Sequence, residues 1–194
     1  TFALDRPAAE LGSRSYSTVL IPDWMTALGD YRDAAGLLGD APGSRLPPAV
    51  VVDYGQIESG LAEHGAPAPV SVTGVDRAGN WEGLDDAEYA ARKTAWVEAF
   101  TRRLDAEWPG FGAAVQHAEM ATARTMATYL GTPGGAVYGF APEPPARIFS
   151  GPPASARTAV PGLWLASAFT GFGGYAGAMG GGAVAARAAL KMLG

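Results

Sequence analysis

Glycine and proline are spread through this chain so densely that few stretches of regular structure can be long. The 194 residues include 27 glycines and 15 prolines. Because glycine and proline interrupt helices and strands alike, this pattern favours short strands joined by turns. The longest stretch without either residue includes 85–108. The sequence therefore predicts a sheet of short strands and a prominent helix.

The amino-acid composition excludes several classes of protein. The chain is 48% hydrophobic and 17% charged, which indicates a folded protein, and its length predicts one domain or a domain with a fragment of a second. The net charge is −5 and no run of basic residues is present, so nucleic acid is not expected as a partner. The absence of cysteine and the presence of only two histidines exclude thiolate and three-histidine metal sites. No apolar stretch reaches the roughly 18 residues of a membrane span.

Short apolar runs in the first part of the chain have the length and the β-branched content of strands. They lie at 2–4, 18–21, 49–52 and 69–73. The spacing around 61–73 is too short for a crossover helix, which favours antiparallel pairing there. The segment 24–39 is either a short helix or an irregular connection.

Apolar residues recur every three or four positions from 85 to 108, the spacing of one helix face. Asp85 or Asp86 is the expected N-cap, and Glu88 lies in the first turn, where the helix dipole favours a negative charge. Pro109 and Gly110 are expected to end the helix. The sequence thus predicts helices at 85–108 and 123–130, with a strand at 115–121 between them.

Glycine and proline crowd around isolated aromatic residues from 131 to 153. Flexible linkers seldom carry so many aromatic groups, so we favour an ordered wall over a linker. Farther on, the pattern predicts a turn and a short buried strand at 161–167, a glycine-rich loop at 168–177 and a helix at 178–190. A loop of this kind presents backbone amides to an anionic or carbonyl-bearing ligand.

The residues from Gly171 to Ala176 satisfy the G-x-G-x-x-A pattern of dinucleotide-binding loops. That pattern requires a further strand and an acidic residue about 20 positions later, which holds the ribose. No acidic residue follows Ala176. We therefore do not predict an ADP-binding loop at this place.

The same C-terminal residues resemble the closing segment of FAD-dependent oxidoreductases of the phytoene desaturase, carotenoid isomerase and retinol saturase group. The similar stretches are 160–166, 173–178 and 183–187, and 129–139 is similar to the glycine–tyrosine–glycine element that precedes them. The chain departs from the family at Ser167 and Ala168, where a glycine is usual, and at Ala123, where a threonine–proline pair is common.

The resemblance implies a fold between α+β and α/β. Residues 1–150 would form part of a substrate-binding domain, a mostly antiparallel sheet with helices. Residues 151–194 would supply the closing strand, loop and helix of an FAD-binding Rossmann-like domain, whose N-terminal ADP-binding unit is not in this sequence. FAD is thus implied as cofactor only together with an N-terminal FAD-binding portion or a separate partner subunit.

The resemblance also implies site residues for a desaturase, dehydrogenase or isomerase that acts on an apolar, for example isoprenoid, small molecule. Oxidation, isomerisation and saturation stay open, and no catalytic residue or metal ligand is identified. The residues expected to contact FAD are Ser167, Ala168, Gly173, Gly174, Tyr175, Ala176 and Gly177. The residues expected to line the substrate face are Tyr138, Phe140, Phe172 and Tyr175.

Two other classes stay open. One is a non-catalytic scaffold subunit that has kept the fold without the cofactor. The other is a hydrolase that uses Thr1 as an N-terminal nucleophile, although the chain has only two lysines to assist it. The expected location is the cytoplasm, and peripheral contact with a membrane is left open.

Overall fold

The computed structural model describes residues 1–62, 65–139, 156–170 and 173–193. The chain divides into two compact units, Thr1–Thr125 and Met126–Gly194. We call them unit 1 and unit 2 and describe each by itself. The domain boundary expected near residue 150 lies outside the described residues.

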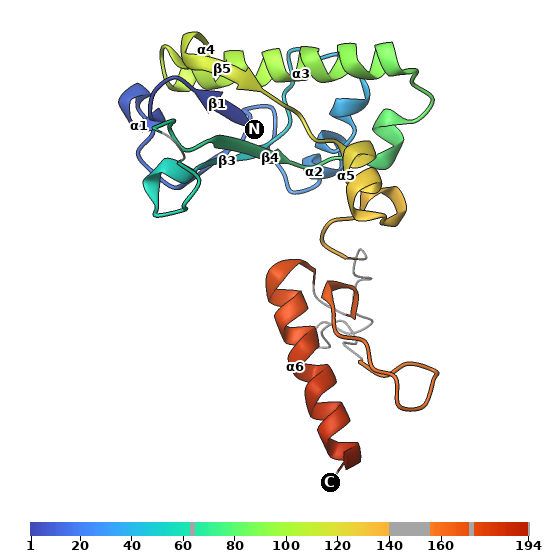
Figure 1. Ribbon diagram of the computed structural model, residues 1–194. Helices are drawn as coiled ribbons and strands as arrows, with labels where there is room; N and C mark the ends of the chain where they lie inside the picture. The colour runs from blue at the N-terminus through green and yellow to red at the C-terminus, as the bar shows by residue number, and fades with distance from the viewer. Residues whose placement is uncertain (63–64, 140–155, 171–172, 194) are drawn as a thin grey trace. The chain divides into compact units, whose positions relative to one another are not determined.

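Unit 1 contains a five-stranded antiparallel sheet with the strand order β2-β3-β4-β1-β5 (Figure 1). Its strands are β1 (Phe2–Leu4), β2 (Ser17–Leu20), β3 (Ala49–Asp53), β4 (Val70–Gly74) and β5 (Val115–Ala118). Each predicted strand in this unit is confirmed to within a few residues. The α+β class and the antiparallel pairing are confirmed as well.

The α-helices of the described residues are α1 (Ala8–Leu11), α2 (Asp30–Ala34), α3 (Asp86–Glu107), α4 (Phe111–Ala114), α5 (Ala123–Leu130) and α6 (Gly174–Leu193). Short 3-10 turns lie at Leu37–Gly39, Tyr54–Gln56, Ala78–Trp81, Pro133–Gly135 and Ala168–Thr170. The bounds predicted for α3 and α5 are confirmed. The open question at 24–39 is resolved as the short helix α2 followed by a 3-10 turn.

Helix α3 is fixed at both ends by the residues that the sequence indicates. The Glu88 amide donates to the Asp85 carboxylate at 2.8 Å, and the Asp85 amide donates to the Glu88 carboxylate at 3.0 Å, which makes a capping box. After the helix, Gly110 has a φ of 93°, a conformation that glycine adopts without steric cost. The helix therefore starts and stops by local chemistry.

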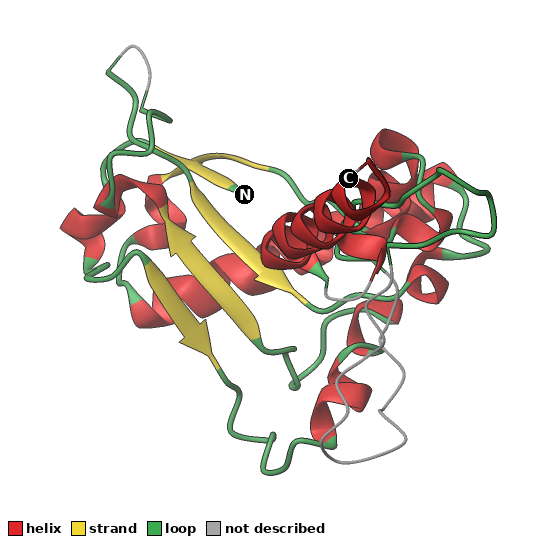
Figure 2. Ribbon diagram, turned by 90° about the horizontal axis from the view of Figure 1, so that it is seen from below, coloured by secondary structure: helices red, strands yellow, loops and turns green. Residues whose placement is uncertain are grey.

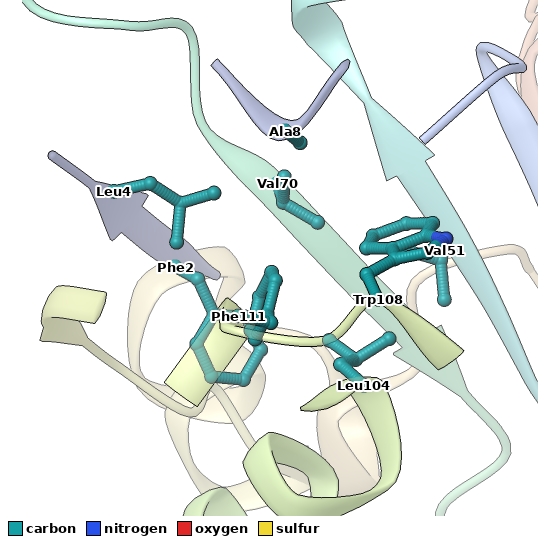
Figure 3. Packing of buried hydrophobic residues seen from close by; sticks show 8 residues of the cluster. All are labelled: Phe2, Leu4, Ala8, Val51, Val70, Leu104, Trp108 and Phe111. Carbon is teal, nitrogen blue, oxygen red and sulfur yellow. The ribbon is translucent and has the colours of Figure 1, made fainter. Parts of the chain in front are cut away.

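Helices α3 and α4 cover one face of the sheet and form the main core with it (Figures 1 and 3). The Phe2 and Phe111 rings meet edge to face, with centroids 5.3 Å apart. A second cluster of buried residues combines Trp96 and Ala99 of α3 with Leu38 and Trp81. The buried side chains of the main core are Phe2, Leu4, Ala8, Val51, Val70, Leu104, Trp108 and Phe111.

The other face of the sheet carries a row of β-branched residues. In the register, Val19 lies opposite Val50, and Val50 lies opposite Thr73. Val19 is 58% exposed and Val50 is half-buried. Figure 2 views the strands from this side, with α3 passing behind them. Among the described residues of unit 1, no helix covers this face of the sheet as α3 and α4 cover the core face.

Unit 2 differs from expectation in two places. The buried strand expected at 161–167 is not confirmed, because within the described residues this segment pairs through no more than an isolated bridge between Arg157 and Trp164. Leu163 and Leu165 are each about half exposed. Helix α6 begins at Gly174, four residues earlier than predicted, so part of the predicted glycine loop is its first turn. The Rossmann-like closing element is thus not confirmed.

Candidate functional site

Three separate segments of unit 2 meet, backbone against backbone, at the start of α6. The Gly174 amide donates to the Tyr138 carbonyl at 3.0 Å. A Cβ added at Gly139 would collide with the Ala168 carbonyl, and one added at Gly173 would collide with the Tyr138 carbonyl. We call this contact region the glycine junction; it comprises Tyr138, Gly139, 167–170, 173–174 and Gly181.

The middle of α6 completes the glycine junction. A Cβ added at Gly181 would lie 2.6 Å from Thr170 Oγ1 and 2.7 Å from the Ser167 carbonyl oxygen. The Ser167–Thr170 turn is itself closed by hydrogen bonds, since Thr170 Oγ1 donates to the Ser167 carbonyl at 2.7 Å and the Phe169 amide donates to Ser167 Oγ at 3.0 Å. The turn is therefore held directly on the helix.

The first turn of α6 is the part of this region that is open to a ligand. Tyr175 is 89% exposed and Ala176 is exposed, whereas Gly177 is buried. In the first turn of any helix the backbone amides lack partners within the helix and carry the positive end of its dipole. The exposed Tyr138 ring lies beside this turn, because a Cβ at Gly174 would be 3.0 Å from its Cδ1.

The structure brings together most of the residues that the sequence indicated. Ser167, Ala168, Gly173, Gly174 and Tyr138 all belong to the glycine junction. Tyr175, Ala176 and Gly177 follow directly in the first turn of α6. Phe140 and Phe172, which were expected to line a substrate face, lie outside the described residues.

Glycine is required at the glycine junction because of contacts within the chain itself. The Cβ positions of Gly139 and Gly173 are taken by backbone carbonyls of the protein itself, and Gly174 has a φ of 72°. These glycines are therefore required for packing and leave no ligand-sized space at those points. The residues that fit a flavin edge or a phosphate are those of the open first turn, Tyr175 and Ala176, because exposed helix-end amides suit such groups.

Unit 1 contains a buried carboxylate to which sequence reasoning assigned no chemical role. Asp53 is 2% exposed at the end of β3. It accepts hydrogen bonds from Ser13 Oγ at 2.6 Å, the Gly55 amide at 2.9 Å and Gln56 Nε2 at 3.1 Å. Each oxygen of the carboxylate accepts at least one of these hydrogen bonds, as a buried polar group requires. Through these bonds Asp53 connects the loop after α1 with the 3-10 turn after β3. Only the Asp-x-Gly spacing gave a sign of this turn.

The surface hollows among the described residues of unit 1 include the following two. One, of about 310 Å³, is lined by Pro7, Ala8, Asp53, Tyr54 and Glu58 among others. The other, of about 380 Å³, lies between β2 and α3, and we call it the Trp24 hollow. Its main lining residues are Leu20, Trp24, Arg45, Leu46, Phe100 and Arg103.

Thr1, the alternative nucleophile, is engaged at the edge of β1. Its hydroxyl hydrogen-bonds with Ser71 Oγ at 3.2 Å, and its amine donates to the Glu119 carbonyl at 2.8 Å. Burial lowers the pKa of this amine, and the Glu119 carboxylate partly opposes that effect. Lys93, one of the two lysines, lies with its ammonium 5.4 Å from the centre of the Tyr89 ring. The hydrolase alternative stays a prediction.

Comparison of the chain with protein-family models, with curated proteins and with solved structures finds no match in any of the three. Among the helices of the described residues, none is long and apolar enough to cross a membrane.

Proposed function

We propose that this chain is the C-terminal part, or a subunit, of an FAD-dependent oxidoreductase that acts on an apolar small molecule. The observation that carries the proposal is the glycine junction, which fixes an open helix start beside the Tyr138 ring. This arrangement supports a contact between helix amides and one edge of a flavin. The sequence resemblance supplies the identity of the cofactor.

The surface of unit 2 supports the need for a partner. Helix α6 has only Arg187 and Lys191 as charged residues along its length, yet large apolar side chains on it are exposed. Met179 is 73% exposed and Leu190 is 67% exposed. In unit 2, the buried hydrophobic residues among those described are Ala156 and Ala185. A helix that is apolar on most sides is normally covered by other protein, so we infer that a further polypeptide segment packs on it.

In the proposed enzyme, bound FAD would accept or donate the hydride of the reaction. The amides of the first turn of α6 would hydrogen-bond to the flavin and favour negative charge there, by about 0.3–1 kcal/mol for a helix dipole. The Tyr138 and Tyr175 rings would exclude water from the substrate side.

A pair of substitutions at Tyr175 tests the amide contact. Proline is tolerated in the first turn of a helix, where it removes an amide donor and preserves the helix start. We expect Tyr175→Pro to lower flavin occupancy at least tenfold and Tyr175→Ala to lower it far less. Both variants are prepared together with the polypeptide that precedes or accompanies the chain in its source, and flavin is measured by absorbance per mole of protein.

The controls of this experiment are the far-ultraviolet circular dichroism and the melting temperature, which should match for the two variants. If both variants keep full occupancy, the first turn of α6 does not bind the flavin. If Tyr175→Ala loses as much as Tyr175→Pro, the side chain and not the amide makes the contact.

The packing role of the glycines favours a second candidate, a scaffold subunit without cofactor. Gly139, Gly173 and Gly181 are required by contacts inside the chain, so their presence does not depend on a ligand. Protein isolated with its natural partner would then carry no flavin absorbance, whereas the oxidoreductase would be yellow.

A further inference from the structure

We propose that the Trp24 hollow of unit 1 binds a small amphipathic carboxylate, with its apolar body between β2 and α3 and its carboxylate on Arg45 and Arg103. The hollow is built entirely from described residues of unit 1. The proposal goes beyond the proposed oxidoreductase function and does not depend on it.

The apolar lining of the hollow comes from several elements. Leu20 lies at the end of β2, Ala49 begins β3, and Phe100 projects from α3. The volume of about 380 Å³ lies within the range of small-molecule sites. At about 30 Å³ for each water-sized group, it holds roughly a dozen non-hydrogen atoms. A ten-carbon carboxylate is of this size.

The exposed Arg45 lies against an indole ring that is itself fixed by a hydrogen bond. Trp24 Nε1 donates to the Leu46 carbonyl at 2.8 Å, which fixes the indole ring. The Arg45 guanidinium lies over this ring, 5.3 Å from its centre. Among the described residues no carboxylate is ion-paired with Arg45. An exposed cation beside the hollow is therefore available to an anion.

A second cation lines the same hollow from α3. Arg103 Nη2 is paired with the Glu107 carboxylate at 2.9 Å, one turn farther along the helix. A guanidinium has five N–H donors, so this pair leaves donors of Arg103 for a second acceptor. Arg45 and Arg103 are far apart in the sequence, yet both line the same hollow. Isolated surface arginines do not share a hollow in this way.

The charges around the hollow favour a single negative charge. Asp23 also lines it, and Glu107 lies beside Arg103, so two carboxylates offset part of the field of the two arginines. A dianion such as a phosphate monoester would meet more repulsion than a carboxylate does. An uncharged apolar molecule would leave both guanidinium groups unused. A monocarboxylate with an apolar tail therefore fits the hollow best.

Titration of the full chain with decanoate, followed by amide and indole NMR, tests this proposal. We expect a dissociation constant of a few millimolar, the scale that a ligand of about a dozen non-hydrogen atoms reaches. Shifts are expected at the Trp24 indole and at residues 20, 46 and 100. Decan-1-ol and decyl phosphate are expected to bind at least tenfold more weakly.

Arg45→Gln and Arg103→Gln should each weaken decanoate binding about tenfold or more, since a charged hydrogen bond is lost. Arg102→Gln is the matched control, because Arg102 is the neighbour of Arg103 on α3, is 70% exposed and pairs only at 3.9 Å with Glu98. It should bind decanoate as the unchanged protein does. Equal melting temperatures show that the variants are folded.

Three results would overturn the proposal. The first is equal binding of decanoate and decan-1-ol, which would mean that the arginines take no part. The second is an equal loss of affinity in Arg102→Gln, which would indicate a nonspecific charge effect. The third is binding of anionic vesicles without binding of monomeric decanoate, which would assign this surface to a membrane.

Discussion

Neighbouring glycines in α6 do different things, and the difference is set by what faces each one. Gly181 lies against the Ser167 carbonyl and the Thr170 hydroxyl, so any side chain there pushes on the backbone of the turn. Gly182, one residue later, has no heavy atom within 4 Å of the position where a Cβ would be. The sequence Gly-Gly-Gly at 180–182 gave no means to tell these positions apart.

Substituting alanine for Gly181 and for Gly182 should therefore change stability in opposite directions. Gly182→Ala is expected to stabilise α6 by up to about 1 kcal/mol, because alanine has the higher helix propensity. Gly181→Ala is expected to destabilise the glycine junction by about 1–3 kcal/mol, as overpacking does. Urea unfolding followed by circular dichroism measures both. Equal effects of the two substitutions would show that the turn does not pack on α6.

Helix α3 shows what a sequence predicts well at the level of an element. Its period, its acidic first turn and its Pro-Gly end are local signals, and they agree with the packing of Trp96 and Leu104 into the cores. At the start of α6 the local signals do not agree with the structure, because Gly174 and Gly177 by themselves disfavour a helix. That start depends on the hydrogen bond from Gly174 to Tyr138, a contact distant in sequence.

The expected strand at 161–167 was wrong for a related reason. Its apolar residues, among them Leu163 and Leu165, have the composition of a buried strand. A strand, however, needs a neighbour to accept and donate its hydrogen bonds. In the described residues its pairing is limited to the bridge between Arg157 and Trp164. That Arg45 and Arg103 line the same hollow likewise could not be predicted from the residues next to them in the sequence.

The capping box of α3 makes a prediction at this scale. Asp85→Ala removes the acceptor for the Glu88 amide and should lower the free energy of unfolding by about 1 kcal/mol. Glu98→Ala, an exposed change in the middle of the same helix, is the control and should have little effect. Chemical denaturation gives both values. If Glu98→Ala lowers the free energy of unfolding as much as Asp85→Ala does, the capping box stabilises α3 no more than an ordinary exposed residue.

At the scale of the whole molecule, the two units differ in how much they bury. Unit 1 has two clusters of buried hydrophobic residues under α3, whereas unit 2 exposes Tyr129, Tyr175 and Met179 at 73% or more. A folded domain seldom exposes so many large apolar side chains without a partner. This contrast is the basis for our proposal that unit 2 is completed by further protein.

The absorbance spectrum of the protein isolated natively from its source tests this account most directly. The chain, together with the polypeptide that precedes or accompanies it, should show flavin bands and release FAD on denaturation. Residues 1–194 alone should bind added FAD weakly or not at all. Tight, stoichiometric binding of FAD by residues 1–194 alone would contradict the account, as would the absence of flavin from the natively isolated complex.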